Sequence, residues 1–97
     1  METLKKNFGK EMEQIYFRAL DEEKYRATRF LHMVHEKGGW ETAKYLLAQP
    51  TISDGFAELW QRGRLDLTVE ALVILDPWKQ LFTDQEQAVA RKRLEAK

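Results

Sequence analysis

The stretch LTVEALVIL at residues 67–75 is the most apolar part of the chain, and it decides the fold class. Its β-branched residues are compatible with a strand as well as with a helix. A lone strand is not stable, however, and no second strand candidate exists to pair with it. The stretch is therefore predicted to be a buried central helix, capped by Asp66 or Thr68, in an all-α protein.

Amphipathic helices are predicted on the N-terminal side of this stretch. The apolar face of a first helix, of about 16 residues, consists of Leu4, Phe8, Met12, Ile15 and Ala19. Gly9 lies inside that helix and weakens its first turns by about 1 kcal/mol relative to Ala. Acidic residues 21–23 predict the start of a second helix, which ends at Gly38-Gly39. The inner face of this second helix consists of Ala27, Phe30, Leu31 and Val34.

Proline, glycine and capping residues mark the next two helices. A third helix is predicted over residues 40–48, and Pro50 ends it. Ser53 or Asp54 caps the helix that follows, and Gly63 stops it. That fourth helix is expected to bury Phe56, Leu59 and Trp60.

The C-terminal part carries two further helix-start signals. Asp76-Pro77 predicts a single helical turn. Thr83 and Glu86 form a capping box that opens a last, polar surface helix, from Asp84 to about Ala96. Because the connections look short, we expect a compact orthogonal bundle of about five to six short helices. Residues 1–97 are predicted to form a single helical domain.

Composition indicates a globular chain and excludes several classes of protein. Of the 97 residues, 43% are hydrophobic and 33% are charged, and the formal net charge is zero, which lowers the expectation of strong nucleic-acid binding. The absence of Cys excludes disulfides, thiolate catalysis, zinc fingers and iron–sulfur clusters. The longest apolar run, residues 71–75, is far shorter than the roughly 20 residues that span a bilayer. We therefore expect a soluble, cytoplasmic protein without membrane contact.

The sequence contains no assembled catalytic set. Ser53 is the only Ser, and it lacks the Gly-x-Ser-x-Gly pattern of a nucleophile elbow. No Lys-Ser/Thr follows Gly38-Gly39, as a phosphate-binding loop requires. The carboxylates of residues 21–23 are interpreted as helix-start residues rather than acid–base catalysts. We predict that the protein is not an enzyme and has no cofactor.

His32 and His35 are the sharpest local candidate for a metal site. They are three residues apart, so both can face one side of a helix and share a metal with a carboxylate from elsewhere. The pattern differs from the His-Glu-x-x-His of zinc proteases. We predict no metal, with one histidine at the surface and the other near the edge of the core. A small metal-dependent enzyme is the weakest alternative.

Aromatic and arginine residues of the first helices predict a protein-interaction site, although the same aromatics could all belong to a generous core. Tyr16 and Phe17 are adjacent, so one narrow helix stripe cannot bury both. Aromatic residues and Arg are enriched at interfaces. The predicted site consists of Tyr16, Phe17, Arg18, Arg26, Arg29 and Trp40. We predict a non-enzymatic adaptor or regulatory module that binds another protein or a second copy of itself, as a homodimer.

The alternative function is that of a nucleic-acid-associated accessory or regulatory protein. A helix, a turn at Gly63 and a second helix have the order of a helix-turn-helix motif. A recognition helix needs polar side chains that read base edges, and residues 67–75 offer few. In this alternative the protein contacts the phosphate backbone instead of the bases. The residues predicted to do so are Arg62, Arg64, Arg91, Lys92 and Arg93.

The run SDGFAELWQRGRLDLTVEALV, at residues 53–73, resembles a family of small bacterial helical domains with no assigned activity. Phe30-Leu31 and Gly38-Gly39 upstream, and residues 81–83 and 90–91 downstream, extend the likeness from about Tyr16 onward. The resemblance implies a compact helical unit of bacterial or phage origin. It implies no functional residue.

Overall fold

The computed structural model describes residues 2–95, and every regular element in that range is helical. The α-helices are α1 (Glu2–Glu23), α2 (Thr28–Lys37), α3 (Gly39–Ala48), α4 (Asp54–Gln61), α5 (Val69–Val73) and α6 (Asp84–Glu95). Two single-turn 3-10 helices, η1 (Leu65–Leu67) and η2 (Trp78–Leu81), connect them. The predicted all-α bundle is therefore confirmed. No helix in this range is both long and apolar enough to cross a bilayer.

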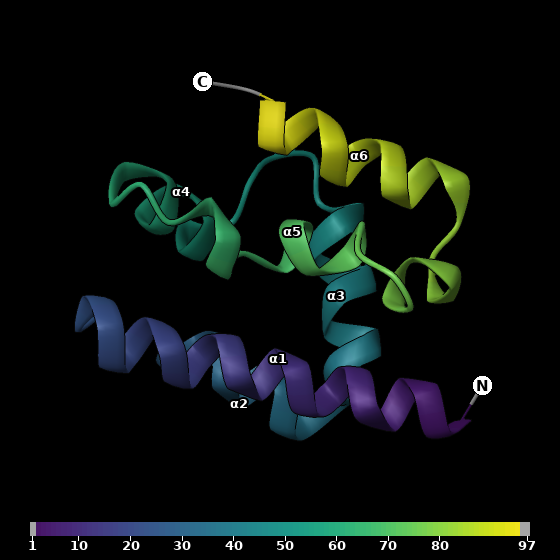
Figure 1. Cartoon of the computed structure of the whole chain (residues 1–97), viewed down its shortest axis with the longest axis horizontal. Coiled ribbons are helices and arrows are strands. Elements are labelled where there is room, and N and C mark those ends of the chain that lie inside the picture. The colour runs from purple at the N-terminus through teal and green to yellow at the C-terminus, as the bar shows by residue number, and fades with distance from the viewer. Residues whose placement is uncertain (1, 96–97) are drawn as a thin grey trace.

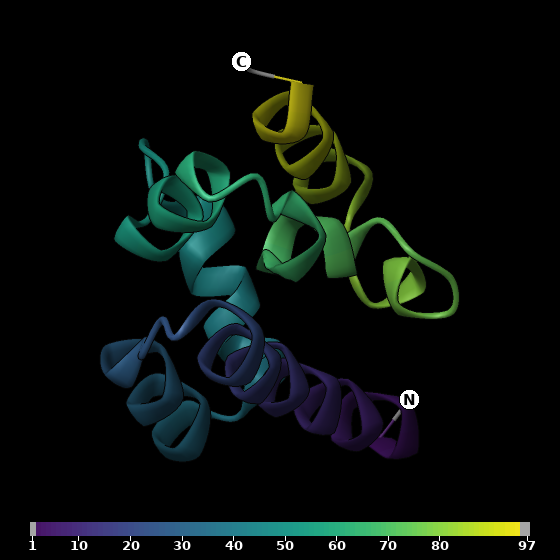
Figure 2. The same cartoon turned by 60° about the vertical axis from the view of Figure 1, so that its left-hand side comes forward.

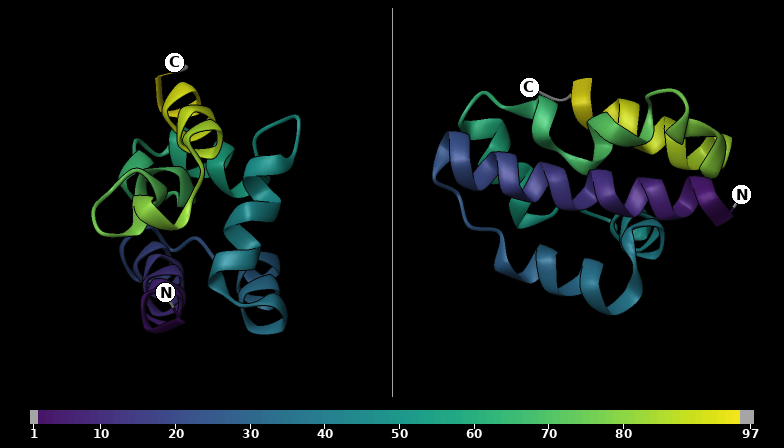
Figure 3. Two further views of the ribbon diagram at one scale, coloured as in Figure 1. Left: turned by 90° about the vertical axis from the view of Figure 1, so that its right-hand side faces the viewer. Right: turned by 60° about the horizontal axis from the view of Figure 1, so that its bottom comes forward.

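The helices form two layers that are joined by α3 (Figure 1). One layer contains α1 and α2, which run antiparallel and contact each other (Figure 3). The other layer contains α4, α5 and α6, with α5 packed against α6 (Figure 2). α3 crosses from the first layer to the second and contacts α1, α2, α5 and α6. Because α1 has 22 residues, it extends along the longest dimension of the molecule, 33 Å.

Aromatic side chains join the two layers near the N-terminal end of α1. Phe8 is completely buried, and its ring lies edge-on to Phe82 with 5.3 Å between the centroids. Trp78 packs against the same Phe8 ring at 5.9 Å. Trp40 donates a hydrogen bond from Nε1 to the Leu81 carbonyl at 2.9 Å. These contacts fasten η2 to α1 and α3 and close this side of the bundle.

The stretch at residues 67–75 lies in the core, as predicted, but its helix is shorter than expected. Thr68 is the N-cap, because its Oγ1 accepts a hydrogen bond from the Ala71 N–H at 3.2 Å. α5 therefore includes only five residues, and Leu75 points to solvent with 54% of its surface exposed. The buried residues of the stretch include Leu67, Val69, Leu72 and Val73.

The predicted boundary between the first two helices is wrong. Residues 21–23 end α1 instead of starting α2, which begins at Thr28. Lys24 takes a left-handed φ of 56°, and the Tyr25 N–H donates to the Ala19 carbonyl at 3.1 Å. A left-handed residue directly after the last turn is a common way for a helix to end. Acidic residues at a helix C-terminus oppose its dipole, so the local sequence did not indicate this end.

Local capping signals at the other boundaries are confirmed, whereas the burial of Trp60 is not. Ser53 accepts the Phe56 N–H at 3.1 Å at the start of α4. Thr83 and Glu86 form the reciprocal capping box, with bonds of 3.1 and 2.9 Å. Trp60 retains 38% of its surface exposed.

Gly9 and Gly39 bring the backbones of α1 and α3 together. A Cβ atom added to Gly39 would lie 2.6 Å from the Gly9 Cα atom, which is too close for any real contact. The glycine that weakens the first helix in a sequence-based view therefore provides the close approach of α3. The turns of α1 around Gly9 are regular from Glu2 onward.

Candidate binding groove

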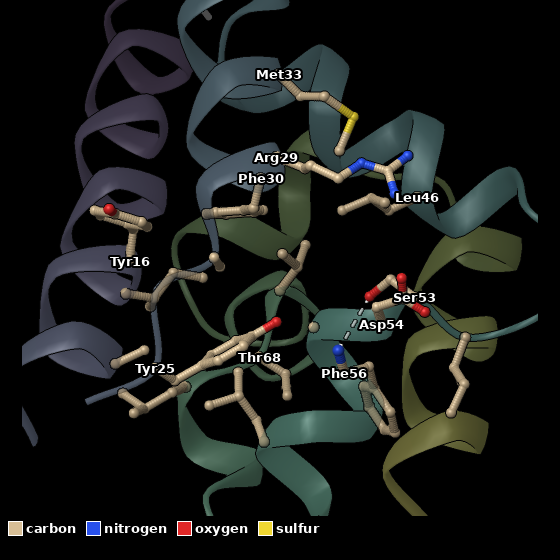
Figure 4. A pocket seen from close by; sticks show the side chains of 18 of the residues that line it. Tyr16, Tyr25, Arg29, Phe30, Met33, Leu46, Ser53, Asp54, Phe56 and Thr68 are labelled. Carbon is tan, nitrogen blue, oxygen red and sulfur yellow. Dashed lines mark hydrogen bonds between the residues drawn. The ribbon is translucent and has the colours of Figure 1, made fainter. Parts of the chain in front are cut away.

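A large hollow opens between the two layers, on the side opposite the aromatic contacts of Phe8. It has a volume of about 920 Å³ and is walled by the C-terminal half of α1, by α2, by the end of α3, and by α4, η1 and α5. Figure 4 shows side chains from these elements converging on the hollow. The apolar part of its lining includes Ile15, Phe30, Met33, Leu46, Phe56 and Leu67.

The hollow exists because α2 is only partly covered. Val34 is the one buried residue that this ten-residue helix contains. Phe30 and Met33 lie on its inner face and remain half-exposed, although Phe30 packs against the core. The apolar inner face predicted for the second helix is therefore real, but its partner surface is incomplete.

A second hollow, of about 610 Å³, lies beside the first between α3, α4 and α6. The two share Gln49, Ile52 and Phe56 in their walls, and we call the two neighbouring hollows together the binding groove. Trp60 and Val89 line its second part. Several large apolar side chains of the groove are exposed: Tyr45 by 46%, Ile52 by 38% and Trp60 by 38%.

Tyr25 places a hydroxyl group inside the first hollow (Figure 4). A Cβ atom on Gly55 would lie 3.9 Å from this hydroxyl oxygen, so the helix start of α4 lies directly beside it. Burial raises the pKa of Tyr25, and the nearby Glu58 and Asp54 carboxylates raise it further. The group is therefore a neutral hydrogen-bond donor and acceptor at ordinary pH. It lies between apolar walls, where one polar group fixes the orientation of a bound molecule.

Arg93 and Glu70 form a buried ion pair next to the groove. Glu70 is only 3% exposed, and its Oε2 accepts a hydrogen bond from Arg93 Nη1 at 3.0 Å. The same guanidinium donates to the carbonyl of Leu46 at 3.1 Å and to that of Gln49 at 2.7 Å. Arg93 therefore ties α6 to α5 and to the end of α3. Its charge is neutralised internally.

Arg64 and Arg62 are also engaged inside the molecule. Arg64 contacts Glu22 at 2.6 Å, Glu23 at 3.0 Å and Asp66 at 3.1 Å. Hydrogen bonds to these carboxylates, first to Asp66, raise the pKa of Arg64. Hydrogen bonds from Arg18 and Arg64 lower the pKa of Glu22, and those from Arg64 lower the pKa of Asp66.

Arg62 completes the end of α1. It donates to the free carbonyl of Glu23 at 2.6 Å and pairs with Glu58 at 3.0 Å. Three of the five residues predicted to contact phosphate, Arg62, Arg64 and Arg93, thus have carboxylate partners. Arg91 and Lys92 lie exposed on α6. The structure does not bring the five into one free basic patch.

The six residues predicted to bind a protein partner divide into two groups. Tyr16, Arg26 and Arg29 line the first hollow. The other three, Phe17, Arg18 and Trp40, are not among the residues that line the binding groove.

Each residue of the second group has a different environment. Phe17 is exposed beside the buried Tyr16 ring. Arg18 pairs with Glu22 at 2.9 Å, and Trp40 is half-buried beneath Lys5. Sequence reasoning missed three residues of the first hollow, Tyr25, Tyr45 and Ile52. The signal in the sequence was that each is a large apolar residue in a turn or on the outer side of a helix.

His32 and His35 lie on the surface in separate pairs. His35 Nε2 is 2.8 Å from a Glu13 carboxylate oxygen, and His32 Nδ1 is 3.9 Å from one of Glu36. Both histidines are exposed, so neither lies near the edge of the core as expected for one of them. Among residues 2–95, no three side chains of metal-ligand type come together.

Comparisons with known proteins leave the groove as the main guide to function. No protein-family model matches the chain, and neither a curated protein nor a solved structure is significantly similar to it. The resemblance of residues 53–73 to small bacterial helical domains therefore stays a prediction.

Proposed function

We propose that the chain is a non-enzymatic protein-interaction module that holds an apolar segment of its partner in the binding groove. One observation carries this proposal. Two neighbouring hollows with apolar side chains in their walls leave Tyr45, Ile52 and Trp60 exposed. Monomeric proteins rarely expose a contiguous apolar surface unless it binds something.

The residue types of the groove support a protein partner. Interface centres are enriched in Tyr, Trp, Phe, Met and Arg and depleted of Lys and Glu. The binding groove combines Tyr25, Phe30, Met33, Trp60 and three arginines in this manner. The nucleic-acid alternative loses support, because Arg62, Arg64 and Arg93 have carboxylate partners within 3.0 Å.

Two exposed groove residues provide the variants for a test. Tyr45→Glu and Ile52→Glu each put a charge on the groove rim, where they should cost little stability because both side chains already reach solvent. Leu75→Glu is the matched control, since Leu75 is equally apolar, 54% exposed and outside the groove. Phe17→Glu, at a side chain 51% exposed, tests the site predicted from sequence.

The tagged full chain would be used to capture partners from cells of its source, with thermal melting as a check on each variant. We expect the groove variants to weaken capture of the same specific protein by roughly 30-fold or more, which is typical of a hot-spot residue. Leu75→Glu should capture it like the original chain. If only Phe17→Glu abolished capture of the partner, the binding site would lie on the exposed face of α1 instead of the groove. Absence of any specific partner, together with a monomeric chain in sedimentation, would reject the proposal.

A further inference from the structure

The arginines of the chain differ in whether a carboxylate neutralises them. Most have a partner, as described above for Arg62, Arg64 and Arg93. Arg26 and Arg29 have no ion pair within residues 2–95, although both are exposed on the wall of the first hollow. Lys92 is likewise unpaired in that range and lines the second hollow. Unneutralised cations therefore line both hollows of the binding groove.

The carboxylates that line the groove do not offset these cations. Two carboxylates are present, Asp54 and Glu70, and Glu70 is bound to Arg93 at 3.0 Å. Among the described residues that line the groove, Asp54 is therefore the one unpaired carboxylate beside three unpaired cations. His32, on the same wall, lies 3.9 Å from Glu36. Because the chain as a whole has zero net charge, this local excess distinguishes the groove from the rest of the surface.

The walls of the groove favour a helical occupant. An extended peptide that binds by strand addition needs the free edge of a sheet, and residues 2–95 contain no strand. Ile52 and Phe56 stand between two apolar hollows. An amphipathic helix presents apolar side chains one and two turns apart on one face, and such a pattern can fill two neighbouring hollows.

We infer that the binding groove takes an acidic amphipathic helix from a partner protein. Its apolar side chains enter the two hollows, and its flanking Asp and Glu residues contact Arg26, Arg29 and Lys92. The Tyr25 hydroxyl hydrogen-bonds to the occupant inside the first hollow. This inference rests on the proposed function and adds the charge and the secondary structure of the partner segment.

Selection from a phage-displayed library of random helix-favouring peptides of about 18 residues, with the full chain as target, tests the inference. We expect the enriched peptides to be amphipathic and net acidic. An enriched peptide, labelled for fluorescence anisotropy, should bind Arg26→Glu/Arg29→Glu roughly tenfold more weakly at low salt, because two attractive pairs become repulsive. The difference should shrink at high salt.

Lys6→Glu/Lys10→Glu is the matched control, with the same change in net charge on exposed residues of α1 outside the groove. It should change the affinity by less than about twofold. The bound peptide should also gain the circular dichroism of a helix. Thermal melting of each variant verifies that it is folded.

The outcomes separate this inference from the proposed function. Neutral or basic peptides that lose binding with Ile52→Glu would overturn the inference while leaving the groove as a protein-binding site. An acidic peptide that stays extended when bound would overturn it too. A dimer that dissociates with Ile52→Glu would assign the groove to a second copy of the chain and reject an acidic helix. Peptides insensitive to Ile52→Glu, or no enrichment at all, would count against both.

Discussion

Gly39 illustrates how one residue sets the distance between two helices. Because Gly39 has no side chain, the start of α3 can approach Gly9 of α1; a Cβ atom on Gly39 would lie only 2.6 Å from the Gly9 Cα. The same change at Gly9 is different. A Cβ atom on Gly9 would have the Gly39 nitrogen as its nearest neighbour, at an ordinary contact distance of 3.8 Å. The two glycines therefore meet each other but are not equivalent.

We predict opposite effects for alanine at these two positions. Gly39→Ala should lower the free energy of unfolding by about 2–3 kcal/mol, because backbone atoms must move apart. Gly9→Ala should leave it unchanged or raise it by up to about 1 kcal/mol, because Ala favours the helix. Urea denaturation of both variants measures the difference. Equal tolerance of the two would contradict the close crossing of α1 and α3.

The C-terminus of α1 depends on residues from another element. Its last turn contains Glu22 and Glu23, which oppose the helix dipole. Arg64 neutralises both carboxylates, and Arg62 caps the Glu23 carbonyl. The turn after α4 therefore stabilises this helix end. This is why the arginines that looked suited to phosphate have a structural role.

The ion pair between Arg93 and Glu70 fastens α6 in a similar manner. Arg93→Met should lower the free energy of unfolding by about 3–5 kcal/mol, because Glu70 would remain as a buried charge without a partner. The double variant Glu70→Leu/Arg93→Met should recover most of that loss, since it removes both charges. Chemical denaturation of the single and double variants gives the coupling directly. A double variant as unstable as Arg93→Met would indicate that the carbonyl bonds of Arg93 matter more than the pair.

Acid should destabilise the molecule through the ion pairs that Arg18 and Arg64 form. The folded-state pKa values of Glu22 and Asp66 are lowered by Arg18 and Arg64. These ionised carboxylates therefore contribute their full share of the folding stability above their ordinary pKa values of about 4. That stability is lost as the pH falls through the lowered values.

We expect the melting temperature to be nearly constant from pH 7 to about 5 and to fall steadily below about 4. Arg64→Gln should melt lower at neutral pH and converge with the original chain in acid, because it lacks the pairs that acid removes. Arg91→Gln, at an exposed residue of α6, should follow the original curve. Parallel curves for Arg64→Gln and the original chain would contradict the role of Arg64.

Parts of the groove could be foreseen, and others could not. Tyr16, Arg26 and Arg29 were expected at a binding site and do line the groove. Tyr45 and Ile52 were missed, because an exposed apolar residue becomes a site only when distant elements leave it uncovered. Trp60 was expected in the core because its helix face is apolar. In the structure 38% of its surface stays exposed.

The sequence by itself determined the helical class, most helix boundaries and their caps. These signals are local, because Ser53, Thr68 and Thr83 each cap within three residues. The tertiary structure alone decided the partners of the charges and the shape of the groove. Arg64 meets Glu23 across 41 positions, and Arg93 meets Glu70 across 23. Such pairings follow from how helices distant in the sequence pack together, and no periodic pattern along the chain encodes them.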